Sequence, residues 1–281
     1  MPGTKIGEAL GVAAKRLIST SSTPRLDAEV LLSHVTGLGR AALLARVEQE
    51  LSAGQAQAFS SLVERRTHGE PVAYLTGHKE FYGLDLLITR DVLVPRPETE
   101  SVVDACLEHL PETGNCRMAD IGTGSGAILV AVATRRPNCR CFGTEISAEA
   151  MAVASENCRR AGVDKRITLL LGDLLEPLPG KMDLLAANLP YVSMGEASPD
   201  VATWEPQVAV FGGGDDGTET IRRFLKSAPA YLLPGGTVIM ETAYSQGKIV
   251  AGLSHDAFPG AEVEVRRDLS GYDRIVVIRI L

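Results

Sequence analysis

"ADIGTGSGAILVAVA", residues 119–133, is the stretch that decides the fold. A short apolar run ends in a turn with three glycines, Gly122, Gly124 and Gly126, and an Ala-, Val- and Leu-rich run of helical composition follows. This order predicts a strand, a tight turn and a helix. In such a unit the small residues let a ligand approach the backbone, and the helix directs its first N–H groups at that ligand. A tight turn without a ligand gives the same pattern, so the glycines alone leave both interpretations open.

Two acidic residues favour a ligand. Asp120 closes the strand just before the glycine turn. Glu145 ends the next predicted strand, about 20 residues beyond the turn, where an acid can bind both ribose hydroxyls. A third predicted strand ends in Gly172-Asp173. Because open α/β sheets bind ligands at the carboxyl ends of their strands, these positions predict a ribose-containing ligand there.

The turn also suggests which nucleoside binds. Its spacing is not the G-x-G-x-x-G of dinucleotide-binding proteins, and it contains no basic residue to meet a phosphate. S-adenosylmethionine fits these features. We expect Glu145 to hold its ribose, the glycine backbone its amino-acid tail, and Asp173 the adenine amino group, with Asp120 facing the positively charged end.

The predicted strand over 183–190 stops abruptly at Asn188-Leu189-Pro190-Tyr191. Pro190 restricts Leu189 to an extended conformation, which fixes the direction of the Leu189 carbonyl. That carbonyl and the Asn188 side-chain oxygen are two acceptors that could hold one planar –NH2 group and aim its nitrogen at a methyl donor. Tyr191 offers a flat face to a planar substrate. The alternative is an ordinary Asn-x-Pro turn.

From about residue 117 onward, predicted strands alternate with predicted helices. This pattern indicates a mostly parallel, doubly wound sheet of the α/β class, with helices on both faces. The last two strands have no helix between them, which predicts an antiparallel strand near the end of the sheet. The strands are expected at 117–122, 140–146, 167–173, 183–190, 237–243, 261–265 and 273–281, and the helices at 126–135, 148–161, 217–232 and 244–254.

Residues 1–75 have a different pattern, typical of a small helical bundle. Thr23-Pro24 predicts a helix start, with the threonine hydroxyl as cap, and Gly37 predicts its end. Ser52 with Gln55 fits a capping box. Residues 80–95 alternate and predict two short strands in a hairpin, and Pro97 then starts a helix.

Composition limits the remaining function classes. The 281 residues carry a net charge of −7 and are 45% hydrophobic, which disfavours a wide nucleic-acid-binding surface. No run approaches the ~20 apolar residues of a membrane span, and the first residues contain no apolar signal core. The five cysteines are odd in number and show no zinc-ligand spacing. We expect a cytoplasmic monomer with reduced cysteines and no metal, membrane or nucleic-acid partner.

Several stretches resemble one known family, the N5-glutamine methyltransferases of peptide chain release factors (the PrmC/HemK family). Asn-Leu-Pro-Tyr after a glycine loop is similar to the N/D-P-P-Y/F tetrad of amino-methyltransferases. The resemblance covers nearly the whole chain, and GEPVAYLTG, EFYGL and PRPETE are its most specific parts. The stretches are RLDAEVLLSHV, RRTHGEPVAYLTGHKEFYGL, VLVPRPETE, DIGTGSGAI, NLPYV, EPQVAVFGGGDDG and LLPGG.

The resemblance implies a class I S-adenosylmethionine-dependent methyltransferase with a Rossmann-like sheet. It implies three parts: an N-terminal helical substrate-recognition domain over 1–75, a β-hairpin linker over 76–96 and a methyltransferase domain over 97–281. The substrate it implies is the glutamine of the Gly-Gly-Gln motif in class I release factors. An adenine amino group in nucleic acid and a different protein glutamine are the alternatives.

The resemblance also assigns roles to residues. It implies that Arg96 and Thr99 help to close the cofactor pocket. The sequence departs from the family at Leu189, where the tetrad usually has its first proline, but leucine supplies the same backbone carbonyl. The implied cofactor-binding residues are Gly122, Thr123, Gly124, Ser125, Gly126, Glu145, Asp173, Leu174 and Asn188. The implied substrate-binding residues are Asn188, Leu189, Pro190 and Tyr191, of which Asn188 and Tyr191 are the catalytic candidates.

Overall fold

The structure, a computed structural model, describes residues 4–268 and 270–281. The chain divides into two compact units, residues 1–78 and residues 79–281. Among the described residues, no helix is both long and apolar enough to cross a membrane.

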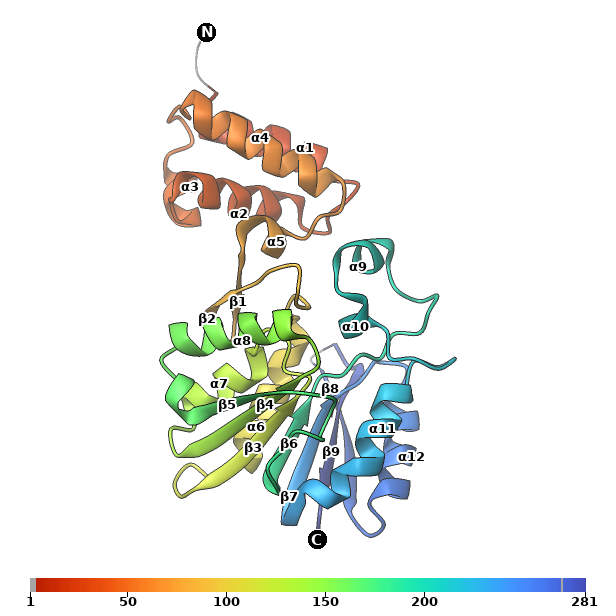
Figure 1. Cartoon of the computed structure of the whole chain (residues 1–281). Helices are drawn as coiled ribbons and strands as arrows, with labels where there is room; N and C mark the ends of the chain where they lie inside the picture. Colours follow the sequence, from red (N-terminus) through yellow and green to blue (C-terminus); the bar gives the residue numbers. More distant parts are fainter. Residues whose placement is uncertain (1–3, 269) are drawn as a thin grey trace. The chain divides into compact units, whose positions relative to one another are not determined.

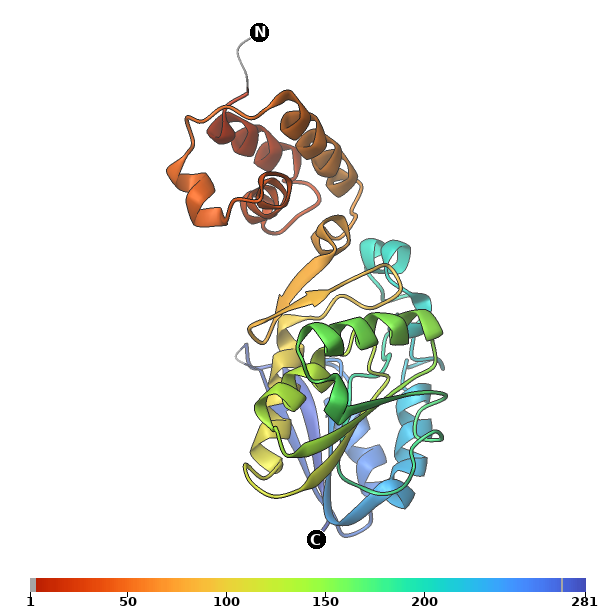
Figure 2. The ribbon, with the colours of Figure 1, turned by 60° about the vertical axis from the view of Figure 1, so that its left-hand side comes forward.

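The first unit is built from helices (Figures 1 and 2). Apolar residues at helical spacing, among them Leu10, Leu31, Leu32 and Phe59, are buried together between the helices and form its core. The helices are α1 (Ile6–Arg16), α2 (Pro24–Thr36), α3 (Arg40–Ala45), α4 (Ala53–Thr67) and α5 (Val72–Thr76).

The helix ends follow most of the sequence signals. Gly37 ends α2 in the left-handed conformation, and Ser52 and Gln55 form the expected capping box at α4. The predicted hydroxyl cap at Thr23 is wrong. The Thr23 hydroxyl accepts no backbone N–H, because the Thr23 backbone, with φ −131° and ψ 57°, is not in the extended conformation typical of a capping residue. The hydroxyl donates to the carboxylate of Asp27, 3.2 Å away.

A two-stranded hairpin follows the helices, formed by β1 (His78–Phe81) and β2 (Leu84–Leu87). Tyr82 and Gly83 make the turn, both with positive φ, as a tight hairpin turn requires. The Tyr82 hydroxyl donates to Asp104, 2.7 Å away, which anchors this strained residue. Asp104 lies on α6 (Glu100–His109), which continues a short 3-10 helix, η1 (Pro97–Thr99).

A seven-stranded sheet organises the second unit in the order β5-β4-β3-β6-β7-β9-β8. All neighbouring strands from β5 to β7 are parallel, and β9 runs antiparallel to both of its neighbours. This confirms the doubly wound sheet and the antiparallel strand near its end. The strands are β3 (Cys116–Ile121), β4 (Cys139–Glu145), β5 (Ile167–Leu171), β6 (Met182–Ala187), β7 (Leu232–Glu241), β8 (Glu262–Arg267) and β9 (Asp273–Arg279).

Helices cover both faces of the sheet (Figure 1). On one face lie α6, α7 (Ala127–Arg135) and α8 (Ala148–Arg160), and on the other α11 (Glu219–Ser227) and α12 (Gly247–Ala257). The order of the strands reverses between β3 and β6, since the chain moves outward to β4 on one side of β3 and returns to β6 on the other. Such a switch point opens a crevice at the carboxyl ends of the strands.

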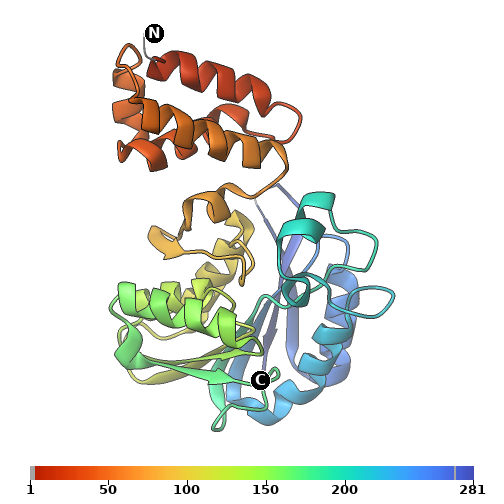
Figure 3. The ribbon, with the colours of Figure 1, turned by 45° about the horizontal axis from the view of Figure 1, so that its top comes forward.

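Some elements differ from the sequence prediction. The helix expected over 217–232 ends at Ser227, because Pro229 lies in a 3-10 turn, η3 (Ala228–Tyr231), that leads directly into β7. Two short helices between β6 and α11 were not predicted, α9 (Pro199–Trp204) and α10 (Gln207–Val210), shown in teal in Figure 3. The remaining 3-10 turn is η2 (Asp164–Arg166).

Candidate active site

The glycine turn is held against the end of the neighbouring strand. Gly122, Gly124 and Gly126 all have positive φ, between 55° and 79°, which explains why three glycines stand here. The Thr123 N–H donates to the Thr144 carbonyl, 2.9 Å away, and the Gly124 N–H donates to the Glu145 carboxylate at the same distance. The shape of the turn therefore depends on β4 as well as on its own residues.

Glu145 is buried at the end of β4, as the sequence predicts. Besides the Gly124 N–H, its carboxylate accepts hydrogen bonds from the N–H groups of Ile146 and Ser147, at 2.9 and 3.0 Å. These three bonds fix the carboxylate at the wall of a cavity and use about three of its four acceptor sites.

The side-chain amide of Asn157 stabilises the glycine turn through a hydrogen bond to its backbone. Asn157, fully buried on α8, donates through Nδ2 to the carbonyls of Ser125 and Leu87, at 2.8 and 3.0 Å. Its Oδ1 accepts from the Leu87 N–H at 2.7 Å. No pattern in the sequence indicates this residue, since an asparagine inside a helix is usually exposed.

Asp120 lines the same cavity and is almost completely buried. Burial raises the pKa of its carboxyl to about 7, although a hydrogen bond from the Thr123 hydroxyl at 2.6 Å opposes this rise. Its second oxygen, Oδ1, is buried without a hydrogen-bond partner among the described residues. An unpartnered buried acceptor on an acid suits a ligand with a cationic or N–H group. The residues therefore fit a nucleoside that carries positive charge.

Asp173 and Leu174 follow β5 and also line the cavity. The Asp173 carboxylate forms an ion pair with Arg223 of α11, which the sequence did not predict. Leu174 has a φ of 47°, unusual for leucine, and is half-buried against the apolar core. The sequence predicts that both residues contact the adenine of a bound nucleoside.

Asn188 follows β6 on the other side of the switch point, and its amide nitrogen has two partners. It donates to the Glu241 carboxylate at 3.0 Å and to the Thr99 hydroxyl oxygen at 3.2 Å. No described residue bonds to Asn188 Oδ1 or to the Leu189 carbonyl oxygen, so these two acceptors remain free for a ligand. This is the acceptor pair that the sequence predicts.

Leu189, in the position of the family's proline, points into the core. A Cβ atom added to Gly122 would lie 3.2 Å from its Cδ2 atom, so the leucine packs directly on the glycine turn. The two parts of the site predicted separately from the sequence are thus in contact.

Tyr191 is placed by its hydroxyl and by its backbone. The hydroxyl lies 3.4 Å from the Glu241 carboxylate, and burial raises the tyrosine pKa. Its carbonyl accepts a hydrogen bond from Gln246 Nε2 at 2.9 Å, and the same Nε2 donates to the Asp216 carbonyl at 2.8 Å. Neither Tyr191 nor Gly126 is among the residues that line the cavity.

The glycine-rich stretch FGGGDDG, residues 211–217, packs backbone on backbone against the segment after Asn188. A Cβ atom at Gly212 would lie 2.5 Å from the Pro190 carbonyl oxygen, and one at Gly217 would lie 2.3 Å from the Tyr191 carbonyl oxygen. The Gly212 N–H donates to the Val192 carbonyl at 3.1 Å. Only glycine allows this approach, so the stretch supports the Asn188–Tyr191 segment.

Arg96 and Thr99, expected near the cofactor pocket, have different surroundings. Thr99 lines the cavity and its hydroxyl donates to Glu241 at 2.6 Å. Arg96 forms an ion pair with the buried carboxylate of Glu205, at the end of α9, and does not line the cavity. Arg96 therefore joins the segment before η1 to the insertion between β6 and α11.

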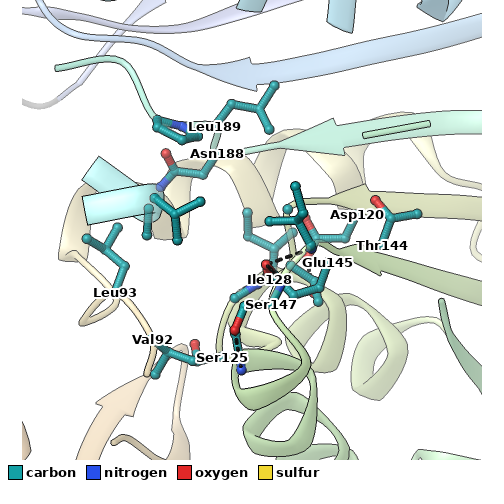
Figure 4. Close-up of a pocket in the computed structure, with 18 of the residues that line it drawn as sticks. Val92, Leu93, Asp120, Ser125, Ile128, Thr144, Glu145, Ser147, Asn188 and Leu189 are labelled. Atoms are coloured by element: carbon teal, nitrogen blue, oxygen red, sulfur yellow. Dashed lines mark hydrogen bonds between the residues drawn. The ribbon is translucent and has the colours of Figure 1, made fainter. Parts of the chain in front are cut away.

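One cavity brings most of the predicted residues together (Figure 4), with Asn188 and Leu189 on one side and Asp120, Glu145 and Ser125 on another. Sequence reasoning missed Asn157, Glu241, Gln246 and Arg223. Glu241 had a signal that could have found it, because it is an acid near the end of a predicted strand, like Glu145. The others lie inside or next to helices, where no local pattern distinguishes them.

Solved structures agree with this sheet. A methyltransferase from Pyrococcus furiosus superposes with a TM-score of 0.54 at 18% identity, covering 78% of this chain and 96% of that one. A ribosomal protein L11 methylase from Lactobacillus delbrueckii subsp. bulgaricus gives a TM-score of 0.50 at 20% identity, covering 66% and 81%. With the strand order, these likenesses define the fold as that of a class I methyltransferase.

Relatives identify the family. Residues 8–77 match the model of the PrmC N-terminal domain, and residues 100–205 match that of the methyltransferase small domain. The release factor glutamine methyltransferase of Moorella thermoacetica is 43% identical over 95% of both chains, and that of Coxiella burnetii 37% identical over 98% of both. The chain belongs to the family of release factor glutamine methyltransferases.

Proposed function

We propose that this protein transfers a methyl group from S-adenosylmethionine to the side-chain amide nitrogen (N5) of the glutamine in the Gly-Gly-Gln motif of class I release factors. The observation that carries this proposal is the pair of free acceptors at Asn188 and Leu189, in the cavity that also holds Asp120 and Glu145. Such a pair suits a substrate with a primary amide, and the close relatives bear the name of that activity.

The cofactor would lie along the carboxyl ends of β3, β4 and β5. We assign its amino-acid tail to the backbone of Gly122–Gly126, its ribose to Glu145, and its adenine to Asp173 and Leu174. Asp120, with one unpartnered oxygen, would face its positive charge. When bound, S-adenosylmethionine supplies an electrophilic methyl group.

The protein's own contribution is to hold the amide. An amide nitrogen is a weak nucleophile because its lone pair is delocalised into the carbonyl. Asn188 Oδ1 and the Leu189 carbonyl would accept the two N–H hydrogens of the glutamine, which places more electron density on nitrogen and fixes its direction. The nitrogen gains the methyl group and loses one of its two protons, so a proton leaves the clamp as the product forms. The Tyr191 ring would lie beside the substrate.

Methyl transfer to a purified class I release factor tests the proposal. We expect incorporation from labelled S-adenosylmethionine, with the modified residue mapped by mass spectrometry to the motif glutamine. A release factor with alanine in place of that glutamine is the matched control and should take up no label. Labelling of both proteins to the same extent would contradict the assignment of the substrate residue.

The second candidate, methylation of adenine in nucleic acid, uses the same acceptor pair on an aryl amine. It requires an extruded base and a basic surface, which the net charge of −7 disfavours. Duplex DNA as substrate distinguishes the two candidates, because transfer to DNA without transfer to the release factor would favour the second.

We further propose that the helical unit, residues 1–78, recognises the release factor and that the protein acts as a monomer. The match to a dedicated N-terminal domain model, separate from the methyltransferase match, supports a distinct role for this unit.

A further inference from the structure

A buried carboxylate lies behind the proposed amide clamp. Glu241, the last residue of β7, is 2% exposed, and its Oε2 accepts hydrogen bonds from the Thr99 hydroxyl at 2.6 Å and from Asn188 Nδ2 at 3.0 Å. Its Oε1 lies 3.4 Å from the Tyr191 hydroxyl. One carboxylate therefore joins both catalytic candidates and the start of α6.

This contact determines which end of the Asn188 amide faces a substrate. An amide has a donor end and an acceptor end of nearly the same shape, so packing alone cannot select between them. A carboxylate oxygen that already accepts from Thr99 attracts the –NH2 end and repels the carbonyl end. With –NH2 held by Glu241, the acceptor Oδ1 is the end left for the substrate.

We propose that Glu241, together with Thr99, is a positioning residue that fixes the Asn188 amide with its oxygen toward the substrate. This inference rests on the proposed function, in which Oδ1 accepts a hydrogen from the glutamine –NH2. If the amide turned over, its –NH2 group would meet the substrate –NH2 group, donor against donor, and the clamp would lose one of its two acceptors.

The arrangement does not depend on the charge of Glu241. Burial raises the pKa of Glu241, while the Thr99 hydrogen bond and the positive charge of Arg274 oppose that rise. A proton on Oε1 would be directed at the Tyr191 oxygen and would leave Oε2 free to accept from Thr99 and Asn188. The orienting atom is thus an acceptor in both protonation states.

A pair of substitutions isolates this role. Glu241→Gln can keep its carbonyl oxygen in the place of Oε2, so it should hold Asn188 and retain kcat within about threefold of the unmodified protein. Glu241→Met has similar length but only a weak thioether acceptor, so kcat should fall by about 10- to 100-fold, the scale of losing a group that orients a reacting group. The dissociation constant of S-adenosylmethionine should change by less than about threefold in both variants.

Thr99→Val gives a second, milder test, because it removes one partner of Asn188 and leaves Glu241 in place. We expect a loss of kcat smaller than that of Glu241→Met. Ser254→Ala is the matched control for stability, since it removes a buried hydrogen bond to the Val250 carbonyl on α12 and lines no part of the cavity. Its kcat should remain that of the unmodified protein.

Two results would overturn the inference: full kcat in Glu241→Met, or a loss in Glu241→Gln as large as in Glu241→Met. Failure of the proposed function would look different, since the unmodified protein would then not methylate the release factor at all. The orientation can still be tested in that case. A high-resolution crystal structure of Glu241→Met with Asn188 in a changed rotamer supports the inference, and an unchanged rotamer contradicts it.

Discussion

Two side-chain amides, one behind the glycine turn and one at the cavity wall, use their hydrogen-bonding groups in different ways. Asn157 engages both ends inside the protein and has a structural role. Asn188 engages only its nitrogen, so its oxygen remains for a ligand. Of the two, only Asn188 was predictable, because a proline two residues later distinguishes it from an ordinary polar residue. The role of each asparagine therefore depends on whether its side-chain oxygen has a hydrogen-bond partner within the protein.

Asn188→Ala should abolish turnover and leave the fold intact. The substitution removes one acceptor of the amide clamp, and the loss of one such electrostatic contact lowers kcat by at least about 100-fold. Thermal unfolding should give a midpoint near that of the unmodified protein. Retention of full turnover in methyl-transfer assays would show that Asn188 does not hold the substrate.

The raised pKa of Asp120 leads us to expect that cofactor affinity depends on pH. Its carboxyl has a pKa of about 7 in the free protein, raised by burial, so it is partly protonated near neutrality. A cationic ligand binds the ionised form more tightly, so binding releases a proton and affinity rises with pH through that range. Compared with Asp120→Asn, the native protein should gain about tenfold in affinity between about pH 6 and pH 8. Isothermal titration measures this, and equal pH dependence in both proteins would contradict the role.

At the scale of elements, the site is supported by segments far from it in the sequence. The Gln246 side chain donates hydrogen bonds to the carbonyls of both Tyr191 and Asp216. The small size of Gly212 and Gly217 lets residues 211–217 pack against the segment after β6. The sequence predicted the strands that carry the site, because apolar runs and glycine turns are local signals. It did not predict these supports, because each joins residues distant in the chain and no local pattern encodes the partner.

Gly217→Ala should disturb the clamp through this packing. Its Cβ would lie 2.3 Å from the Tyr191 carbonyl oxygen, so the backbone beside Asn188 must move. We expect kcat to fall by about tenfold or more, because small displacements of a positioned group are costly. Steady-state kinetics with the release factor measures this.

Gly214→Ala is the matched control for that substitution. Gly214 has nearly the same φ, +69° against +72°, but the nearest atom to an added Cβ is 3.6 Å away. Both variants therefore incur the cost of a left-handed alanine, about 1–2 kcal/mol, and only Gly217→Ala incurs the overlap. Equal activities in the two variants would exclude the packing explanation.

At the scale of the whole molecule, every residue that lines the cavity falls within residues 79–281. The fold class and most site positions were predictable, since the alternation of strands and helices and the acids at strand ends are visible in the sequence. The division near residue 78 coincides with the change from helical spacing to alternation. The insertion between β6 and α11 was not predictable, because α9 and α10 are too short to show a period.

A fragment of residues 79–281 should bind S-adenosylmethionine as the full chain does, within about threefold, because the cavity is complete within it. Its kcat/KM for the release factor should fall, since the proposed recognition unit is missing, whereas methylation of a short Gly-Gly-Gln peptide should not change. Circular dichroism checks that the fragment is folded. If the fragment had the same kcat/KM for the whole release factor as the full chain, the helical unit would have no role in substrate recognition.

Asn157 also makes one amide proton a reporter of the site. The Leu87 N–H is held by Asn157 Oδ1, and the same side chain holds Ser125 in the glycine turn. Opening of the turn and exposure of this N–H to water are therefore linked events. In hydrogen–deuterium exchange, Leu87 should exchange more slowly once S-adenosylmethionine orders the turn, although Leu87 does not line the cavity. The exchange rate of the Leu87 N–H, in a hairpin strand remote in sequence from the glycine turn, would then report whether the ligand is bound.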